Sequence, residues 1–174
     1  DIAEKNNVDY HVVIHNSQET ANLVKQYDLD VGIILGARIL KPVAFNNFKI
    51  GVLNMHPGIL PENRGLDNLK WAIISKLSQG VTTHLIDKNI DRGIIVEQEK
   101  INIYRDDTLI DVHIRLQNLE QKLMISSLQK LKVQFQQIKH NSPLEKGTYH
   151  RSVPPDVESG LEHLFKEYKE EFAL

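Results

Sequence analysis

Short apolar runs separated by polar turns recur along the first hundred residues of the chain. Most of these runs are rich in Val and Ile and are bounded by Gly, Pro, Asn or Asp, which favours strands over helices. A near-continuous apolar run is typical of a parallel strand that is covered on both faces. We expect strands over residues 10–14, 31–35, 50–53, 81–86 and 94–101.

Longer segments carry apolar residues at intervals of three and four, which predicts amphipathic helices. Ser17 suits the N-cap of the first helix, and Thr108 suits the start of the longest one. A stretch rich in turn formers, residues 139–155, precedes a final acidic and lysine-rich helix. We expect helices over residues 18–27, 66–77, 107–131 and 156–172, and a short one after Pro42.

Strands and helices alternate along the chain, which is the rhythm of βαβ units in an α/β fold with an open sheet. The most informative polar residues follow the apolar run at residues 50–53. Asn54 and His56 are two residues apart, so both side chains leave an extended strand on the same face. Two prolines and two glycines stiffen the loop over residues 57–65. An amide and an imidazole would thus stand together at the mouth of the sheet, where ligands usually bind.

Two blocks of sequence carry a family resemblance. Residues 54–65, NMHPGILPENRG, resemble the pattern Asn-x-His-Pro-(Gly/Ser)-x-Leu-Pro-x-x-Arg-Gly. Residues 80–93, GVTTHLIDKNIDRG, resemble the pattern Gly-Val-Thr-x-His-x-x-Asp-x-x-Ile-Asp-x-Gly. Both patterns are typical of the formyltransferases that use N10-formyltetrahydrofolate. Residues 30–40 are similar to the family strand and loop beside the folate, and the whole resemblance covers roughly residues 20–130.

The resemblance implies an open, mostly parallel, Rossmann-like sheet that lacks the first βαβ elements of the family. Family members usually begin with a strand, a Gly-containing loop and a helix, whereas this chain starts at Asp1 without them. We therefore expect either a fragment or a naturally shortened member. Residues 1–135 would form an N-terminally truncated catalytic domain, and residues 136–174 a C-terminal tail with a short helix.

Formyl transfer to an amine defines the chemistry that the resemblance assigns to three residues. The formyl oxygen gains negative charge as its carbon becomes tetrahedral, and a proton must leave the attacking nitrogen. Asn54 would donate to that oxygen, His56 would donate or carry the proton, and Asp91 would orient the imidazole. Taken singly, each of the three is explained as well or better as a turn or loop residue. The family order makes them the catalytic candidates.

The resemblance also implies a pocket for the pterin ring of the cosubstrate. Such a ring needs a mostly apolar slot with backbone groups that pair with its edge. Asp87 could line this pocket or hold a turn, and His84 is expected to be a core or supporting histidine. The residues assigned to the cosubstrate are Arg38, Ile39, Leu40, Ile86, Asp87 and Asp91.

The identity of the amine is open. We assign Arg64, Asn68 and Trp71 to substrate binding, although Arg64 could equally brace its own loop. The tail at residues 147–151, GTYHR, resembles that of sugar N-formyltransferases and favours a nucleotide-linked amino sugar. Phosphoribosylglycinamide formyltransferases fit by size but usually lack this arginine. Methionyl-tRNA formyltransferases carry a second, basic domain for tRNA, which the near-neutral tail here does not resemble. A non-catalytic folate-binding or structural relic and a deformylating hydrolase are further alternatives.

Composition narrows the expected partners. The formal net charge of −2 gives no sign of a polyanion-binding surface, so nucleic acid is an unlikely partner. The chain has no Cys, which excludes disulfides and thiolate metal sites and fits a reducing cytosol. No apolar run approaches the roughly 20 residues of a membrane helix. We expect a cytoplasmic enzyme with a small-molecule amine substrate, no metal and no membrane contact, and we leave homodimerisation open.

Overall fold

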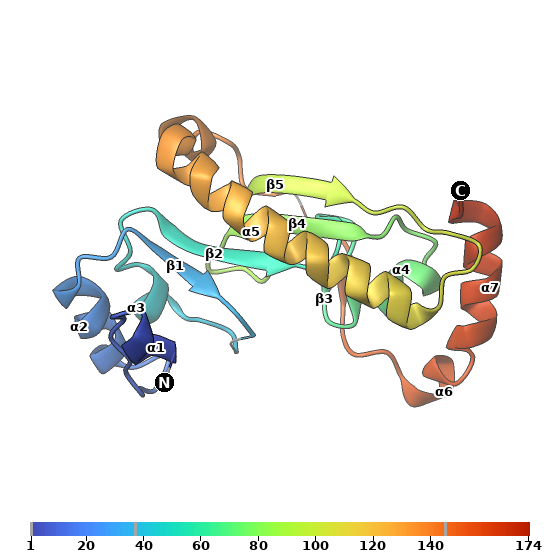
Figure 1. Cartoon of the computed structure of the whole chain (residues 1–174), viewed down its shortest axis with the longest axis horizontal. Coiled ribbons are helices and arrows are strands. Elements are labelled where there is room, and N and C mark those ends of the chain that lie inside the picture. Colours follow the sequence, from blue (N-terminus) through green and yellow to red (C-terminus); the bar gives the residue numbers. More distant parts are fainter. Residues whose placement is uncertain (1, 37, 145) are drawn as a thin grey trace.

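The computed structural model describes residues 2–36, 38–144 and 146–174 of the chain. Its centre is a four-stranded sheet in the order β1-β2-β4-β5, and helix α5 (Leu109–Lys139) runs across one face of it (Figure 1). These four strands are β1 (Val31–Ile34), β2 (Gly51–His56), β4 (Gly80–Leu85) and β5 (Ile94–Lys100). A separate two-stranded sheet joins β3 (Arg64–Gly65) to β6 (Tyr149–His150).

The shorter helices gather at the two ends of the sheet (Figure 1). Helices α1, α2 and α3 lie at the N-terminal end, and α4, α6 and α7 lie at the other, so the two termini are far apart. Their bounds are α1 (Ile2–Lys5), α2 (Gln18–Gln26), α3 (Pro42–Phe45), α4 (Asn68–Ile74), α6 (Pro155–Glu158) and α7 (Leu161–Phe172). Within the described residues, no helix combines the length and the apolar character that crossing a membrane requires.

The sheet combines parallel and antiparallel pairs. Strands β1 and β2 are parallel, and β4 is antiparallel to both β2 and β5. The link between β4 and β5 is too short for the crossover that parallel strands need, so these two strands form a hairpin. The predicted α/β fold class is confirmed. Within the described main sheet, β1 and β2 form the parallel pair.

The core forms where α5 packs on the sheet and on the C-terminal helix. One apolar face of α5 meets Val81 of β4 and the inner side of α7, and the C-terminal part of α5 covers Leu53 and Leu85. The tail therefore contributes to the same core as the sheet. The buried members from α5 and α7 in the larger cluster are Val112, Leu116, Leu119, Leu123, Leu161, Phe165 and Tyr168.

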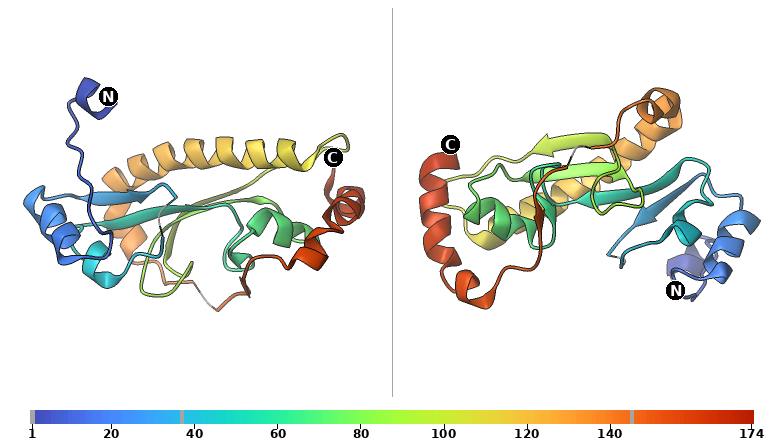
Figure 2. Two further views of the ribbon diagram at one scale, coloured as in Figure 1. Left: turned by 90° about the horizontal axis from the view of Figure 1, so that it is seen from below. Right: turned by 180° about the vertical axis from the view of Figure 1, so that it is seen from behind.

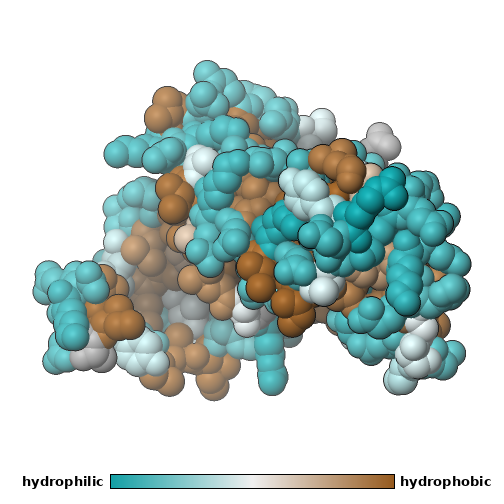
Figure 3. All heavy atoms as spheres, turned by 45° about the vertical axis from the view of Figure 1, so that its right-hand side comes forward, coloured by the Kyte–Doolittle hydropathy of each residue, from teal (hydrophilic) through white to brown (hydrophobic). Residues whose placement is uncertain are grey.

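The strand expected over residues 10–14 is wrong. These residues pair with no described strand, and the side chains of Tyr10, Val12 and Ile14 are 75%, 83% and 73% exposed. A β-rich run becomes a strand only where another strand supplies hydrogen bonds. Figure 2 shows the N-terminal segment leaving the sheet, and Figure 3 shows apolar surface on the side of the N-terminal elements.

Most other elements follow the sequence pattern, with shifted ends. Ser17 caps α2 as predicted, and Thr108 forms a capping box with Asp111 at the start of α5. Helix α4 starts later than expected because Asp67 adopts a left-handed φ of 52°. Helix α5 extends beyond the predicted end, since its later apolar residues pack on the second core cluster. The final helix is divided in two at Ser159 and Gly160.

Candidate active site

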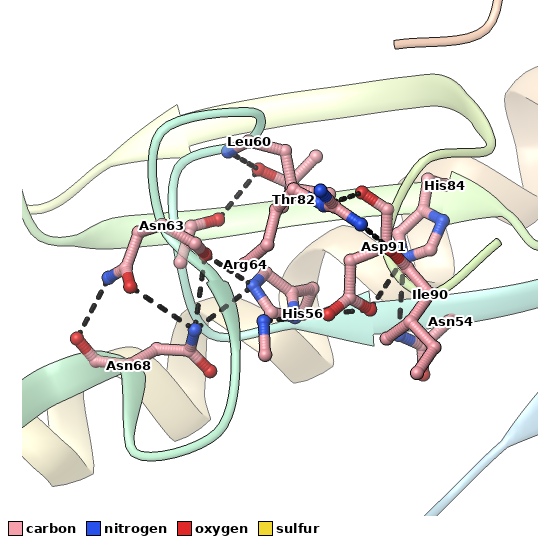
Figure 4. Close-up of polar contacts among 12 residues, drawn as sticks. Asn54, His56, Leu60, Asn63, Arg64, Asn68, Thr82, His84, Ile90 and Asp91 are labelled. Atoms are coloured by element: carbon pink, nitrogen blue, oxygen red, sulfur yellow. Dashed lines mark hydrogen bonds and ion pairs between the residues drawn. The ribbon is translucent and has the colours of Figure 1, made fainter. Parts of the chain in front are cut away.

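Strand β2 delivers Asn54 and His56, and strand β4 delivers His84 beside them (Figure 4). In the antiparallel register, Asn54 lies directly opposite His84, and His56 lies opposite Thr82. Residues opposite each other on paired strands point to the same face of the sheet. One amide and two imidazoles therefore share that face.

Asp91 comes from the loop between β4 and β5 and reaches both histidines (Figure 4). Its Oδ1 lies 3.7 Å from His56 Nδ1 and 3.8 Å from His84 Nε2. Its Oδ2 accepts a 2.9 Å hydrogen bond from the backbone N–H of Gly65. Asp91 has a left-handed φ of 51°, which Asp tolerates better than most residues. The loop thus folds its carboxylate back over the end of the sheet.

The second nitrogen of His56 is fixed by the loop that follows β2. His56 Nε2 donates to the carbonyl oxygen of Asn63 at 2.7 Å, because a carbonyl can only accept. The Nδ1 atom is therefore the one that faces Asp91. Gly58 makes this close approach possible, since a Cβ there would lie 2.7 Å from Asn63 O and 3.0 Å from His56 Nε2.

His84 is a buried residue of the candidate site whose contact the sequence did not specify. Its side chain is 1% exposed, and its Nε2 lies 3.2 Å from Asn54 Nδ2. Burial, and next the nearby His56, lower the pKa of His84 to about 4, although Asp91 opposes this. The imidazole is therefore neutral at neutral pH and can accept one N–H of the Asn54 amide. This contact fixes the orientation of the amide and leaves its second N–H free.

Arg64 braces the loop that carries Asp91. Its guanidinium donates to the backbone carbonyls of Asp91 at 3.2 Å, Gly147 at 3.4 Å and Ile90. The residue is 7% exposed, and its side chain lines none of the cavities found around the site. Of the two roles that the sequence left open, these contacts favour bracing over substrate contact.

The other two residues assigned to substrate differ in placement. Asn68 lines the main cavity, and its Nδ2 donates to Asn63 O at 3.1 Å. Trp71 instead stacks on His150, with 4.5 Å between ring centroids, and its Nε1 donates to Arg151 O at 2.6 Å. Trp71 therefore holds the tail, and the substrate role expected for it has no support in these contacts.

The main cavity, about 700 Å³ in volume, opens beside Asn54 and His56. One wall is a mostly polar stripe on α5, whose residues were not among the candidates assigned from the sequence. Burial raises the pKa of Glu120 within this stripe. The α5 residues that line the cavity are Gln117, Glu120, Gln121 and Met124.

A smaller cavity of about 160 Å³, here called the loop pocket, is also lined by Asn54. It brings together five of the six residues assigned to the cosubstrate: Arg38, Ile39, Leu40, Ile86 and Asp87. Asp87 also accepts from the backbone of Asn89 at 2.8 Å, so it holds a turn as well. Ligand pockets usually exceed roughly 300 Å³, so the loop pocket has room for one ring system at most. Among the described residues, no group of His, Asp and Glu is placed to hold a metal ion.

The sequence is similar to known formyltransferases. A family model described as formyl transferase matches residues 2–128. The chain is 29% identical over 117 residues to a methionyl-tRNA formyltransferase of Chlorobium chlorochromatii, a match that covers 67% of this chain and 37% of that protein. It is 35% identical over 104 residues to the GDP-perosamine N-formyltransferase of Brucella melitensis, covering 59% and 40%. The chain thus spans less than half the length of these two relatives.

The fold is similar to that of a solved formyltransferase from Anoxybacillus kamchatkensis. The TM-score is 0.61 and the identity 29%, over 77% of this chain and 68% of that one. That protein was solved in complex with UDP-4,6-dideoxy-4-formamido-L-AltNAc and tetrahydrofolate. The Rossmann-like fold expected from the sequence is thereby confirmed.

Proposed function

Because this chain belongs to the formyl transferase family, we propose that it transfers the formyl group of N10-formyltetrahydrofolate to the primary amine of a small molecule. The observation that carries the proposal is the position of Asn54. This residue lines both the main cavity and the loop pocket, and it lies beside His56 and Asp91. A formyl donor in the loop pocket and an amine in the main cavity would meet at its side chain.

Asn54 would stabilise the oxygen of the tetrahedral intermediate. One N–H of its amide is engaged by His84, and the second can donate to the formyl oxygen as negative charge develops there. A donor that is already oriented needs no reorganisation during the reaction. Removing one such donor typically costs about 10² to 10³ in rate.

His56 would carry the proton. The attacking amine loses a proton to His56 Nδ1 as the new C–N bond forms, and Asp91 stabilises the resulting imidazolium. The same proton then passes to N10 of the folate as its bond to the formyl carbon breaks. The step leaves a formamide and tetrahydrofolate, and it needs no covalent bond to the enzyme.

The polar lining of the main cavity favours a hydroxyl-rich acceptor. Gln117, Glu120 and Gln121 offer amide and carboxyl groups from one side, and Asn68 does so from the other. The names of two similar proteins point the same way, since one acts on GDP-perosamine and the other was solved with a UDP-linked formamido sugar. We propose a nucleotide-linked amino sugar as the acceptor.

Formyl transfer from N10-formyltetrahydrofolate to a UDP-linked 4-amino sugar, followed by mass spectrometry of the product, tests this function. Asn54→Ala, His56→Ala and Asp91→Ala should each abolish transfer while circular dichroism and thermal unfolding show a folded protein. His163→Ala on α7, where the imidazole side chain is 79% exposed, is the matched control. Release of formate without an amine would indicate hydrolysis instead, and near-normal turnover in any two of the three variants would remove the mechanism.

A further inference from the structure

A second space opens from the main cavity and contains none of the three catalytic candidates. It has a volume of about 440 Å³ and lies between α4, the first half of α5 and α7; we call it the distal groove. Its apolar lining is Leu69, Leu109, Ile110, Leu116 and Leu161. The groove and the main cavity share five residues, among them Asn68, Gln117 and Glu120, so the two spaces are continuous.

The lining of the distal groove is suited to a ligand. Ile110 is 66% exposed although it faces a concave surface, so its apolar area is uncovered in the free protein. Concave sites with apolar walls and a few polar groups are typical of small-molecule binding. Lys70 and His113 supply such polar groups in the groove.

The geometry of α5 sets the length of a ligand that fills both spaces. Glu120 lines the main cavity and Ile110 the far part of the groove, ten residues apart on one helix. At about 1.5 Å of rise per residue, this separation is roughly 15 Å. A ligand that fills both spaces is therefore elongated, with its reacting amine in the main cavity and an apolar group in the distal groove.

Asp67 and Glu120 border the passage between the two spaces, and Lys70 lies on its groove side. The carboxylate of Asp67 is engaged, because its Oδ2 accepts from the backbone N–H of Val153 at 2.9 Å. Burial raises the pKa of Glu120, whose side chain lines both spaces. Lys70 supplies a positive charge on the groove side, where its Nζ pairs with Glu158 at 2.5 Å, and His113 lines the same groove.

We propose that the distal groove binds the nucleobase of the acceptor and so selects nucleotide-linked amino sugars over free amino sugars. A base has two apolar faces, which Ile110 and the leucines would cover, and a polar edge that His113 or Lys70 could meet. The choice of ligand rests on the function proposed above. The groove itself can be tested without turnover.

Binding of UDP to the whole protein, measured by calorimetry, tests the groove directly. Ile110→Asp places a charge among the apolar walls and should weaken UDP binding about tenfold or more, as loss of a contact in a desolvated pocket does. Ile114→Asp is the matched control, because Ile114 lies one turn further along α5, is 48% exposed and lines no part of the groove. This control should bind UDP within about twofold of wild type. Absence of UDP binding by the wild type, or equal weakening in both variants, would overturn the proposal.

Steady-state kinetics test whether the distal groove determines selectivity between nucleotide-linked and free amino sugars. Ile110→Asp should raise the KM for a UDP-linked 4-amino sugar about tenfold with little change in kcat, since uniform binding is lost. The KM for the same amino sugar without the nucleotide should not change. An equal rise for both acceptors would contradict a role in reading the nucleobase. If no acceptor is formylated while Ile110→Asp alone abolishes UDP binding, the proposed reaction fails and the groove remains a nucleotide site.

Discussion

The orientation of the Asn54 amide depends on one buried imidazole. His84 Nε2 can accept from Asn54 Nδ2 because the ring is neutral, and the neutral state follows from the near-complete burial of the ring. His84 lines neither space assigned to a substrate, so we propose that it acts through Asn54 as a positioning residue. Its effect on the reaction should therefore appear in kcat.

We expect His84→Leu to lower kcat for formyl transfer about 100-fold while KM stays within about threefold, because a misoriented oxyanion donor weakens only the transition state. His84→Asn should recover part of the loss, since its side-chain oxygen can accept the same N–H. Steady-state kinetics and urea unfolding of both variants provide the measurement. A loss of kcat that follows the loss of stability, with no recovery in the Asn variant, would argue for a purely structural residue.

The sequence identified the polar residues of the site better than it identified their partners. Asn54, His56 and Asp91 stand in two recognisable blocks, and the structure brings their side chains together. Arg64 and Trp71 stand in or beside the same blocks, but their partners lie 27 and 80 residues away, at Asp91 and Arg151. Local sequence cannot distinguish a side chain that meets a ligand from one that meets a distant carbonyl.

At the scale of elements, strand β6 fixes the loop on which His56 depends. The backbone N–H of Arg64 donates to Thr148 O at 3.1 Å, and that of Leu66 donates to His150 O at 3.1 Å. The loop between β2 and α4 also holds the carbonyl of Asn63, which accepts from His56. A displaced tail should therefore disturb both stability and the candidate catalytic residues.

Two glycines allow this coupling to be measured. A Cβ at Gly147 would lie 1.6 Å from Pro61 O, so Gly147→Ala must push the tail off the loop. We expect it to lower the free energy of unfolding by about 1–3 kcal/mol, as overpacking does, and to reduce formyl transfer. Gly160→Ala is the control, because the nearest atom to its Cβ would be at an ordinary 3.6 Å. Equal urea midpoints for the two variants would show that the tail does not clamp the loop.

The predicted elements agree with the structure where the local sequence alone determines the helix or strand. Helix α2 is defined by Ser17 and by apolar spacing, and strand β1 by a near-continuous apolar run between turns. Residues 10–14 have the composition of a strand but pair with no strand among the described residues. Strand propensity alone was therefore not enough to form a strand there. The C-terminal end of α5 was predicted too early in the sequence. Ile138 packs on the sheet, and this long-range contact extends the helix beyond the end that the local pattern predicts.

At the scale of the whole molecule, three spaces are joined through Asn54 and one helix. The loop pocket and the main cavity meet at Asn54, and the main cavity continues into the distal groove along α5. The loop pocket is formed by segments after β1 and β4, whereas the groove is formed by helices. Since the two outer spaces share no lining residue, ligands at either end should respond to different substitutions.

Because the two outer spaces share no lining residue, a substitution in one should weaken the ligand of that space and leave the other ligand unaffected. Ile39 lines the loop pocket and is 66% exposed, the same exposed fraction as Ile110 in the distal groove. Ile39→Asp should weaken binding of a folate analogue that lacks a formyl group about tenfold and leave UDP binding unchanged, and Ile110→Asp should do the reverse. Calorimetric titration of both ligands against both variants measures all four effects. If either variant weakens both ligands alike, the two ends are coupled through the fold, and if wild type binds no folate analogue, the proposed cosubstrate is wrong.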